Sequence, residues 1–265
     1  MSLLILLAGA TGSAAQDARL KRLDSGDDAA SWEAVGRLDI GGTGFCTGTL
    51  IAPDLVLTAA HCLFDRSTGD RIDHGMMRFL AGFRNGRADA YRGVRRAVVH
   101  PEYAFSQDLT AARVTNDLAL LELMRPIQNA RIRPFETAAE PAPGETVGVV
   151  SYAMGRAEAP SLQETCKVLA RQEGVLVTSC AVDFGSSGAP IFSVRDGVAR
   201  VVSVVSAKAE LEGTQVSLGT ALAAPLAVLN AELDAGRGHD TPPPPRTRVL
   251  AGERNAASGA KFVRP

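Results

Sequence analysis

Asp183-Phe184-Gly185-Ser186-Ser187-Gly188-Ala189-Pro190 places a pair of serines between two glycines. Glycine adopts backbone angles that other residues avoid, so the chain can turn tightly there and direct amide N–H groups to one point beside a hydroxyl. An oxyanion would be held at that point. The same octapeptide also fits an ordinary turn, so a catalytic interpretation needs a base and an orienting acid from elsewhere in the chain.

Two other stretches supply those groups. Leu55-Val56-Leu57-Thr58-Ala59-Ala60-His61-Cys62 is an apolar, β-like run that ends in a histidine and a cysteine. Asn116-Asp117-Leu118-Ala119-Leu120-Leu121-Glu122-Leu123 places an aspartate at the start of a second apolar strand. The order along the chain is therefore His61, Asp117 and Ser187.

Other side chains compete for these roles. Asp65 and Asp108 are rivals of Asp117, but neither begins an apolar strand. Ser186 is the rival of Ser187, and the Gly-x-Ser-Gly-x-Pro spacing favours the second serine. The remaining histidines fit surface or loop positions: His74, His100 and His239.

The three stretches resemble those of the trypsin/chymotrypsin-like serine peptidases, whose motifs look like Thr-Ala-Ala-His-Cys, Asp-(Ile/Leu)-Ala-Leu-Leu and Gly-Asp-Ser-Gly-Gly-Pro. The resemblance covers about residues 35–230 and implies a serine endopeptidase that forms an acyl-enzyme and needs no cofactor or metal. It implies that Ser187 attacks the peptide bond, that His61 transfers its proton, and that Asp117 orients the imidazole. The N–H groups of Gly185 and Ser187 would form the oxyanion hole.

The stretch around the nucleophile departs from the trypsin pattern. Ser186 stands where that family has an aspartate, and no Ile-Val-Gly-Gly-type sequence occurs near Ala34-Val35-Gly36-Arg37. We therefore predict that no freed N-terminus forms an activating salt bridge. Gly-Ser-Ser-Gly-Ala-Pro is more similar to the Gly-Asn-Ser-Gly-Ser-Pro of bacterial glutamyl-endopeptidase-like enzymes.

Two other functions compete with this interpretation. The α/β-hydrolase elbow has a Gly-x-Ser-x-Gly pattern, but it needs a helix directly after the serine and a downstream histidine. Here Pro190 interrupts such a helix, and His239 is the one histidine downstream. The second alternative is an inactive protease-fold binding protein that uses the cleft or a basic tail to hold a partner.

The body of the chain reads as short β-type runs separated by Gly, Pro, Asn and Asp, without long helical periodicity. This pattern predicts an all-β fold, and the resemblance implies two six-stranded antiparallel barrels with the catalytic groups between them. Leu226, Leu229 and Leu233, followed by Gly236, predict a C-terminal helix over 224–235. The predicted strands are Val35–Ile40, Gly44–Ile51, Leu55–Ala59, Met77–Ala81, Gly93–Val99, Leu118–Leu123, Thr146–Tyr152, Thr165–Leu169, Val175–Ser179, Pro190–Ser193, Val198–Ser206 and Val216–Ala221.

The four cysteines favour two disulfides and an oxidising compartment. Two β-type runs flank the three-residue loop Gln172-Glu173-Gly174, and pairing across that loop places Cys166 opposite Cys180, within disulfide reach. The family resemblance implies the other bridge, between Cys46 and Cys62. A metal site is the rival interpretation, but the chain has no Cys-x-x-Cys pair.

The ends of the chain differ in composition from its body. Residues 1–15 are typical of a signal peptide, residues 16–34 form an N-terminal segment before the 35–235 peptidase domain, and 236–265 read as a proline-rich linker and a disordered basic tail. Among 265 residues, 46% are hydrophobic and the net charge is −1, so nothing indicates nucleic acid as a partner. No second run reaches the roughly 18 apolar residues of a membrane span. We expect a secreted or periplasmic monomer acting on a protein or peptide substrate.

Substrate preference stays open at this point. Val182 precedes the nucleophile and is apolar, and Ser206 lies in a later run of small and apolar residues. Both are candidates for substrate contact and favour a small or apolar side chain. Lys208 is the third candidate and instead favours an acidic one.

Overall fold

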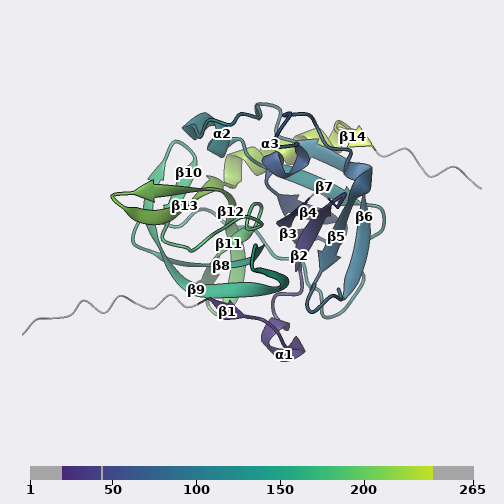
Figure 1. Ribbon diagram of the computed structural model, residues 1–265, viewed down its shortest axis with the longest axis horizontal. Helices are drawn as coiled ribbons and strands as arrows, with labels where there is room; N and C mark the ends of the chain where they lie inside the picture. The colour runs from purple at the N-terminus through teal and green to yellow at the C-terminus, as the bar shows by residue number, and fades with distance from the viewer. Residues whose placement is uncertain (1–19, 43, 241–265) are drawn as a thin grey trace, which may run out of the picture.

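The computed structural model describes residues 20–42 and 44–240. Within this part, two closed antiparallel barrels lie side by side (Figure 1). The predicted signal peptide and most of the predicted tail lie outside the described residues.

The first barrel carries the strands of the N-terminal half. Its hydrogen-bonded order is β6-β5-β2-β3-β4-β7, and pairing of β6 with β7 closes it. Buried and partly exposed residues alternate along β2, as expected of a strand with one face toward a core. The strand bounds are β2 Val35–Ile40, β3 Gly44–Ala52, β4 Leu55–Thr58, β5 Met77–Ala81, β6 Ala90–Val99 and β7 Ala119–Leu123.

The second barrel has the order β9-β10-β13-β12-β11-β8 and closes through β8 and β9. The predicted all-β, two-barrel fold is thus confirmed. The strand bounds are β8 Thr146–Ala153, β9 Arg156–Gln172, β10 Val175–Thr178, β11 Pro190–Arg195, β12 Val198–Leu211 and β13 Thr214–Ala221. The C-terminal helix α3, Ala223–Asp234, is also present.

Strand β9 is much longer than the predicted Thr165–Leu169. Its added N-terminal half buries the polar Ser161 and Gln163, because neighbouring strands cover it on both edges. Paired backbone, and not alternating apolar side chains, makes this segment a strand. Apolar periodicity therefore could not reveal it.

The β9–β10 hairpin has a shorter turn than the predicted three-residue loop. Glu173 and Gly174 form a two-residue turn, both with positive φ (+49° and +80°), and Val175 faces Gln172. A bulge after Val177 then shifts the register by one residue. That shift brings Cys166 and Cys180 together at a Cα–Cα distance of 5.0 Å, and they form a disulfide.

Residues 20–34 pack onto the barrels. Strand β1 (Lys21–Arg22) pairs with β9, and a short helix, α1 (Gly26–Ala29), follows it. Farther along, the Trp32 ring lies 4.9 Å from Phe192 of β11 and 5.9 Å from Phe135 of the inter-barrel connection. The described part of this segment therefore belongs to the same core as the barrels.

The beginning of the predicted linker is also ordered against a barrel. Strand β14 (His239–Asp240) pairs with Ala97 and Arg96 of β6. Its pairing partner is the exposed edge of β6, which no pattern local to residues 236–245 could indicate. Short helical turns that the strand pattern did not predict complete the fold: η1 Ala60–Leu63, η2 His74–Met76 and α2 Ala111–Thr115.

Candidate active site

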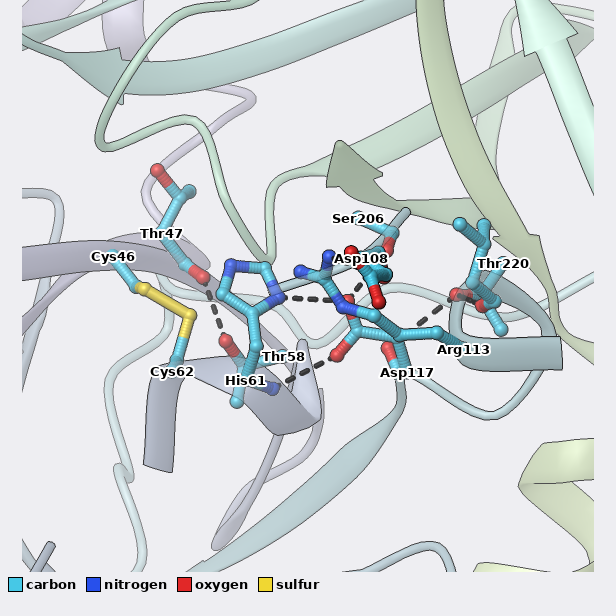
Figure 2. Close-up of polar contacts among 11 residues, drawn as sticks. Cys46, Thr47, Thr58, His61, Cys62, Asp108, Arg113, Asp117, Ser206 and Thr220 are labelled. Atoms are coloured by element: carbon cyan, nitrogen blue, oxygen red, sulfur yellow. Dashed lines mark hydrogen bonds and ion pairs between the residues drawn. A yellow bond between two sulfur atoms is a disulfide. The ribbon is translucent and has the colours of Figure 1, made fainter. Parts of the chain in front are cut away.

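His61 lies in η1, the turn that follows β4 at the end of the first barrel. The Cys46–Cys62 disulfide, with a Cα–Cα distance of 6.3 Å, ties this turn to β3. The histidine side chain is 5% exposed. The disulfide lies on the side of His61 opposite Asp117 and holds the turn from that side (Figure 2).

Asp117 holds His61 through two bonds. The carboxylate accepts the backbone N–H of His61 at 2.8 Å, and the imidazole Nδ1 lies 2.7 Å from its other oxygen (Figure 2). Ser206 of β12 donates its hydroxyl to that second oxygen at 2.5 Å. Because an ionised carboxylate only accepts hydrogen bonds, Nδ1 carries the proton and Nε2 is left as the base.

Asp117 is wholly buried and nevertheless ionised. Burial by itself raises the pKa of this carboxyl, but attraction to His61 and the hydrogen bonds from His61 and Ser206 outweigh it, so the pKa of Asp117 lies below its ordinary value. Both barrels build this environment. Thr220 of β13 also donates its hydroxyl to Val114 at 2.6 Å, holding the end of α2 that leads into the aspartate.

Ser187 lies in the connection between β10 and β11, which contacts both barrels. The carbonyl of Ser187 accepts the N–H of Thr47 at 2.8 Å, and Gly188 donates to Val205 at 2.8 Å. Gly188 has φ +78°, and a Cβ there would lie 2.2 Å from the Thr58 hydroxyl oxygen and 2.3 Å from the Thr47 carbonyl oxygen. Only glycine fits at this position.

The residues before the nucleophile leave two N–H groups open. Gly185 has φ +95°, and its carbonyl accepts the Thr47 hydroxyl at 2.9 Å. The N–H groups of Gly185 and Ser187 donate to no atom of the described residues. The half-buried Ser187 hydroxyl likewise has no hydrogen bond within the described part of the chain, although it and His61 line one cavity.

That cavity has a volume of about 210 Å³ and contains all three predicted substrate contacts, Val182, Ser206 and Lys208. The Lys208 ammonium lies 2.9 Å from Asp183 and 4.7 Å from the centre of the Phe184 ring. Its hydrogen bond keeps the pKa of the Asp183 carboxyl below its ordinary value. Asp183 is therefore a paired anion at the rim.

Sequence reasoning missed two further cations of the same cavity, Arg66 and Arg113. Arg66 follows η1, and its guanidinium lies 5.3 Å from the centre of the Phe184 ring. Arg113 belongs to α2. Neither lies in a recognisable motif, because charged residues in surface connections have no distinctive pattern.

The rival candidates have other places in the structure. Asp65 accepts backbone N–H groups of its own turn, and Ser186 is buried away from His61 and hydrogen-bonds Arg156. His100 lies in the connection after β6, as a loop position predicts, whereas His74 begins η2; neither is at the surface, because both are 5% exposed.

Cys46, His61 and Cys62 place donor atoms within 4.8 Å of one another. Both sulfurs are used in the disulfide, so this cluster does not suit a metal ion. No helix in the described residues has both the length and the apolar character needed to cross a membrane.

Comparison with known proteins gives consistent matches. A family model described as Trypsin matches residues 25–224. The chain is 36% identical over 93 residues to the modular serine protease of Drosophila melanogaster, and 33% identical over 96 residues to the suppressor of tumorigenicity 14 protein homolog of Bos taurus. Each alignment covers 34% of this chain, and they cover 15% and 10% of those longer relatives.

The fold is also found among solved structures. A structure of a Glu endopeptidase in complex with MPD superposes with a TM-score of 0.66 over 80% of this chain and 95% of that one, at 18% identity. This likeness concerns the fold alone.

Proposed function

Because the chain belongs to the trypsin family, we propose that it is a serine endopeptidase whose catalytic groups are His61, Asp117 and Ser187. The observation that carries the proposal is the buried His61–Asp117 pair, which leaves the imidazole Nε2 available in the cavity that Ser187 also lines. A surface that only held a partner would not require a wholly buried, ionised carboxylate behind a histidine.

In this mechanism, the Ser187 hydroxyl attacks the substrate carbonyl while His61 takes its proton. Asp117 keeps the imidazole in one tautomer and stabilises the imidazolium that forms. The imidazolium then gives its proton to the leaving amine, and the acyl group stays on Ser187. Water, activated by the same histidine, releases the acid product and restores the serine.

The open N–H groups of Gly185 and Ser187 would bind the oxyanion of each tetrahedral intermediate. Their value lies in being fixed before the reaction, because the donors need no rearrangement as negative charge develops. Losing one such donor typically costs roughly 3 kcal/mol of transition-state stabilisation.

The cavity suggests which substrates are rejected. Arg66 and Arg113 line it together with the Lys208–Asp183 ion pair, and Asp183 is the one carboxylate among the described residues that line it. A Lys or Arg side chain entering the cavity would be repelled. Small or apolar side chains fit beside Val182, and an acidic side chain would be attracted by the cations.

Two disulfides accord with a secreted or periplasmic protein, since such bridges persist in oxidising compartments. The inactive binding protein remains the alternative, and nothing in the geometry of the cavity specifically favours it.

The decisive experiment is intact-mass analysis after treatment with a fluorophosphonate, beside a Ser187→Ala control. We expect one adduct on the folded protein and none on the control. Cleavage of matched peptides with Ala, Glu or Lys before the scissile bond then defines the preference, with the Lys peptide cleaved slowest. A folded, disulfide-bonded sample that takes no adduct would contradict the proposed function.

A further inference from the structure

Arg156 at the start of β9 contacts the loop that carries the nucleophile. Its guanidinium donates to the Ser151 carbonyl at 2.7 Å and to the Ser151 hydroxyl at 3.0 Å. It also donates to the hydroxyl of Ser186 at 3.3 Å. Ser186 is wholly buried and directly precedes Ser187.

Within the described residues, Arg156 has no ion-pair partner. The carboxylate of Asp183 acts on it only from a distance and pairs instead with Lys208. Burial lowers the pKa of the Arg156 guanidinium, as expected of a cation that is partly removed from water. A desolvated charge without a counter-ion is costly to the folded state, so the three hydrogen bonds to Ser151 and Ser186 are what offset that cost here.

The Ser186 hydroxyl connects this cation to a tight turn. Its oxygen accepts the backbone N–H of Asp183 at 3.3 Å and lies 3.2 Å from the Ser151 hydroxyl. The N–H of Ser186 in turn donates to the Asp183 carbonyl at 2.8 Å. Hydrogen bonds of Ser186 therefore close the turn, and Arg156 donates to the Ser186 hydroxyl.

Gly185 lies inside this turn and Ser187 follows it, so the turn sets the direction of both open N–H groups. We propose that Arg156 is a positioning residue, which fixes the 183–186 turn through Ser186 and so keeps the oxyanion donors aimed into the cavity. The inference rests on the proposed peptidase function. It also explains how the loop is ordered although Ser186, and not an acidic residue, stands directly before Ser187.

The test compares Arg156→Ala, Arg156→Lys and the control Arg195→Ala, which removes an arginine from an exposed ion pair on β11. For Arg156→Ala we expect kcat to fall about 10- to 100-fold, less than the roughly 10²- to 10³-fold cost of losing an oxyanion donor outright, with KM changed less than about twofold. Free guanidinium ion at millimolar concentration should restore part of the lost kcat. Lysine keeps the charge but lacks the two-nitrogen fork that spans the Ser151 and Ser186 acceptors, so it should retain an intermediate kcat.

A second measurement separates positioning from a general effect on folding. Ser186→Ala should reduce kcat, and combining it with Arg156→Ala should cause little further loss, because both changes release the same turn. Unchanged kcat in Arg156→Ala would overturn the inference. So would a loss that guanidinium does not restore and that matches a fall in Tm, or fully additive effects of the two variants.

These outcomes are distinguishable from failure of the proposed function. If the unmodified protein takes no fluorophosphonate and cleaves no peptide, the peptidase proposal fails and the inference with it. If the unmodified protein is active and Arg156→Ala is equally active, only the inference fails.

Discussion

His61 and Asp117 lie on the first barrel and are joined side chain to side chain, whereas Ser187 lies on a loop before β11 that is positioned mainly by its backbone. The pair depends on a buried carboxylate with bonds to His61 and Ser206. The loop depends on glycines with positive φ and on main-chain bonds to Thr47 and Val205. Electrostatic pairing positions the acid–base half of the site, His61 and Asp117. Backbone conformation positions the nucleophile half, the loop that carries Ser187.

Asp117→Asn is the sharpest way to damage the acid–base half alone. The amide oxygen can still accept the backbone N–H of His61, but the amide nitrogen then faces Nδ1 and the Ser206 hydroxyl as a donor, which favours the wrong tautomer of the imidazole. We expect kcat to fall by roughly 10⁴-fold while the Ser187 loop keeps its structure. Peptide cleavage at saturating substrate, with circular dichroism as the folding control, measures this. A loss under about tenfold would mean that Asp117 does not orient the base.

Gly188→Ala tests the nucleophile half. The added methyl group would lie 2.2 Å from the Thr58 hydroxyl oxygen, at a φ of +78° that disfavours any side chain. We expect a loss of about 2–4 kcal/mol in the free energy of unfolding, from strain and overpacking combined. Urea denaturation measures it.

Gly197→Ala is the matched control for that change. Gly197 has a similar φ of +74°, but a Cβ there would have no atom within 4 Å. This variant should lose only about 1 kcal/mol, the cost of the backbone angle alone. Equal losses in the two variants would show that the close approach at Gly188 is unimportant.

Acid should destabilise the first barrel more than the second. This effect on stability should be smaller than those above. All four histidines lie on the first barrel or on β14, which pairs with it. Burial lowers the pKa of His74 and His100. The unfolded chain therefore binds protons more readily at these sites, so their contribution to stability is complete above the unfolded pKa of about 6.5 and declines as the pH falls below it.

His100→Asn isolates this contribution. Its amide oxygen can replace Nδ1 as the acceptor for the Glu102 N–H, and the remaining charged neighbours, Glu102 and Glu232, are unchanged. We expect the drop in Tm between about pH 7.5 and pH 5 to be smaller in the variant than in the unmodified protein. Hydrogen exchange at the lower pH should rise in residues 90–100 before it rises in residues 146–153. An identical drop in Tm would contradict the assignment.

The sequence indicated the all-β character well because most strands carry apolar runs bounded by turn residues, and the family resemblance added the two barrels. The sequence did not reveal the strands that backbone pairing forms without an apolar run. These are the first half of β9, with buried Ser161 and Gln163, and the short strand β14. The bonds that make Asp117 a buried, ionised group were also invisible, since Ser206 is 89 residues away along the chain. Arg156 was missed for the same reason, as nothing near it in sequence marks it as a neighbour of Ser186.

The packing of Trp32 has an optical consequence. It is the single tryptophan of the sequence, and its ring lies against Phe192 of the second barrel and Phe135 of the connection between the barrels. Intrinsic fluorescence therefore reports, from one known location, on the docking of residues 20–34 where the two barrels are joined. Trp32 fluorescence can therefore follow that docking separately from substrate binding in the active-site cavity, without an added label.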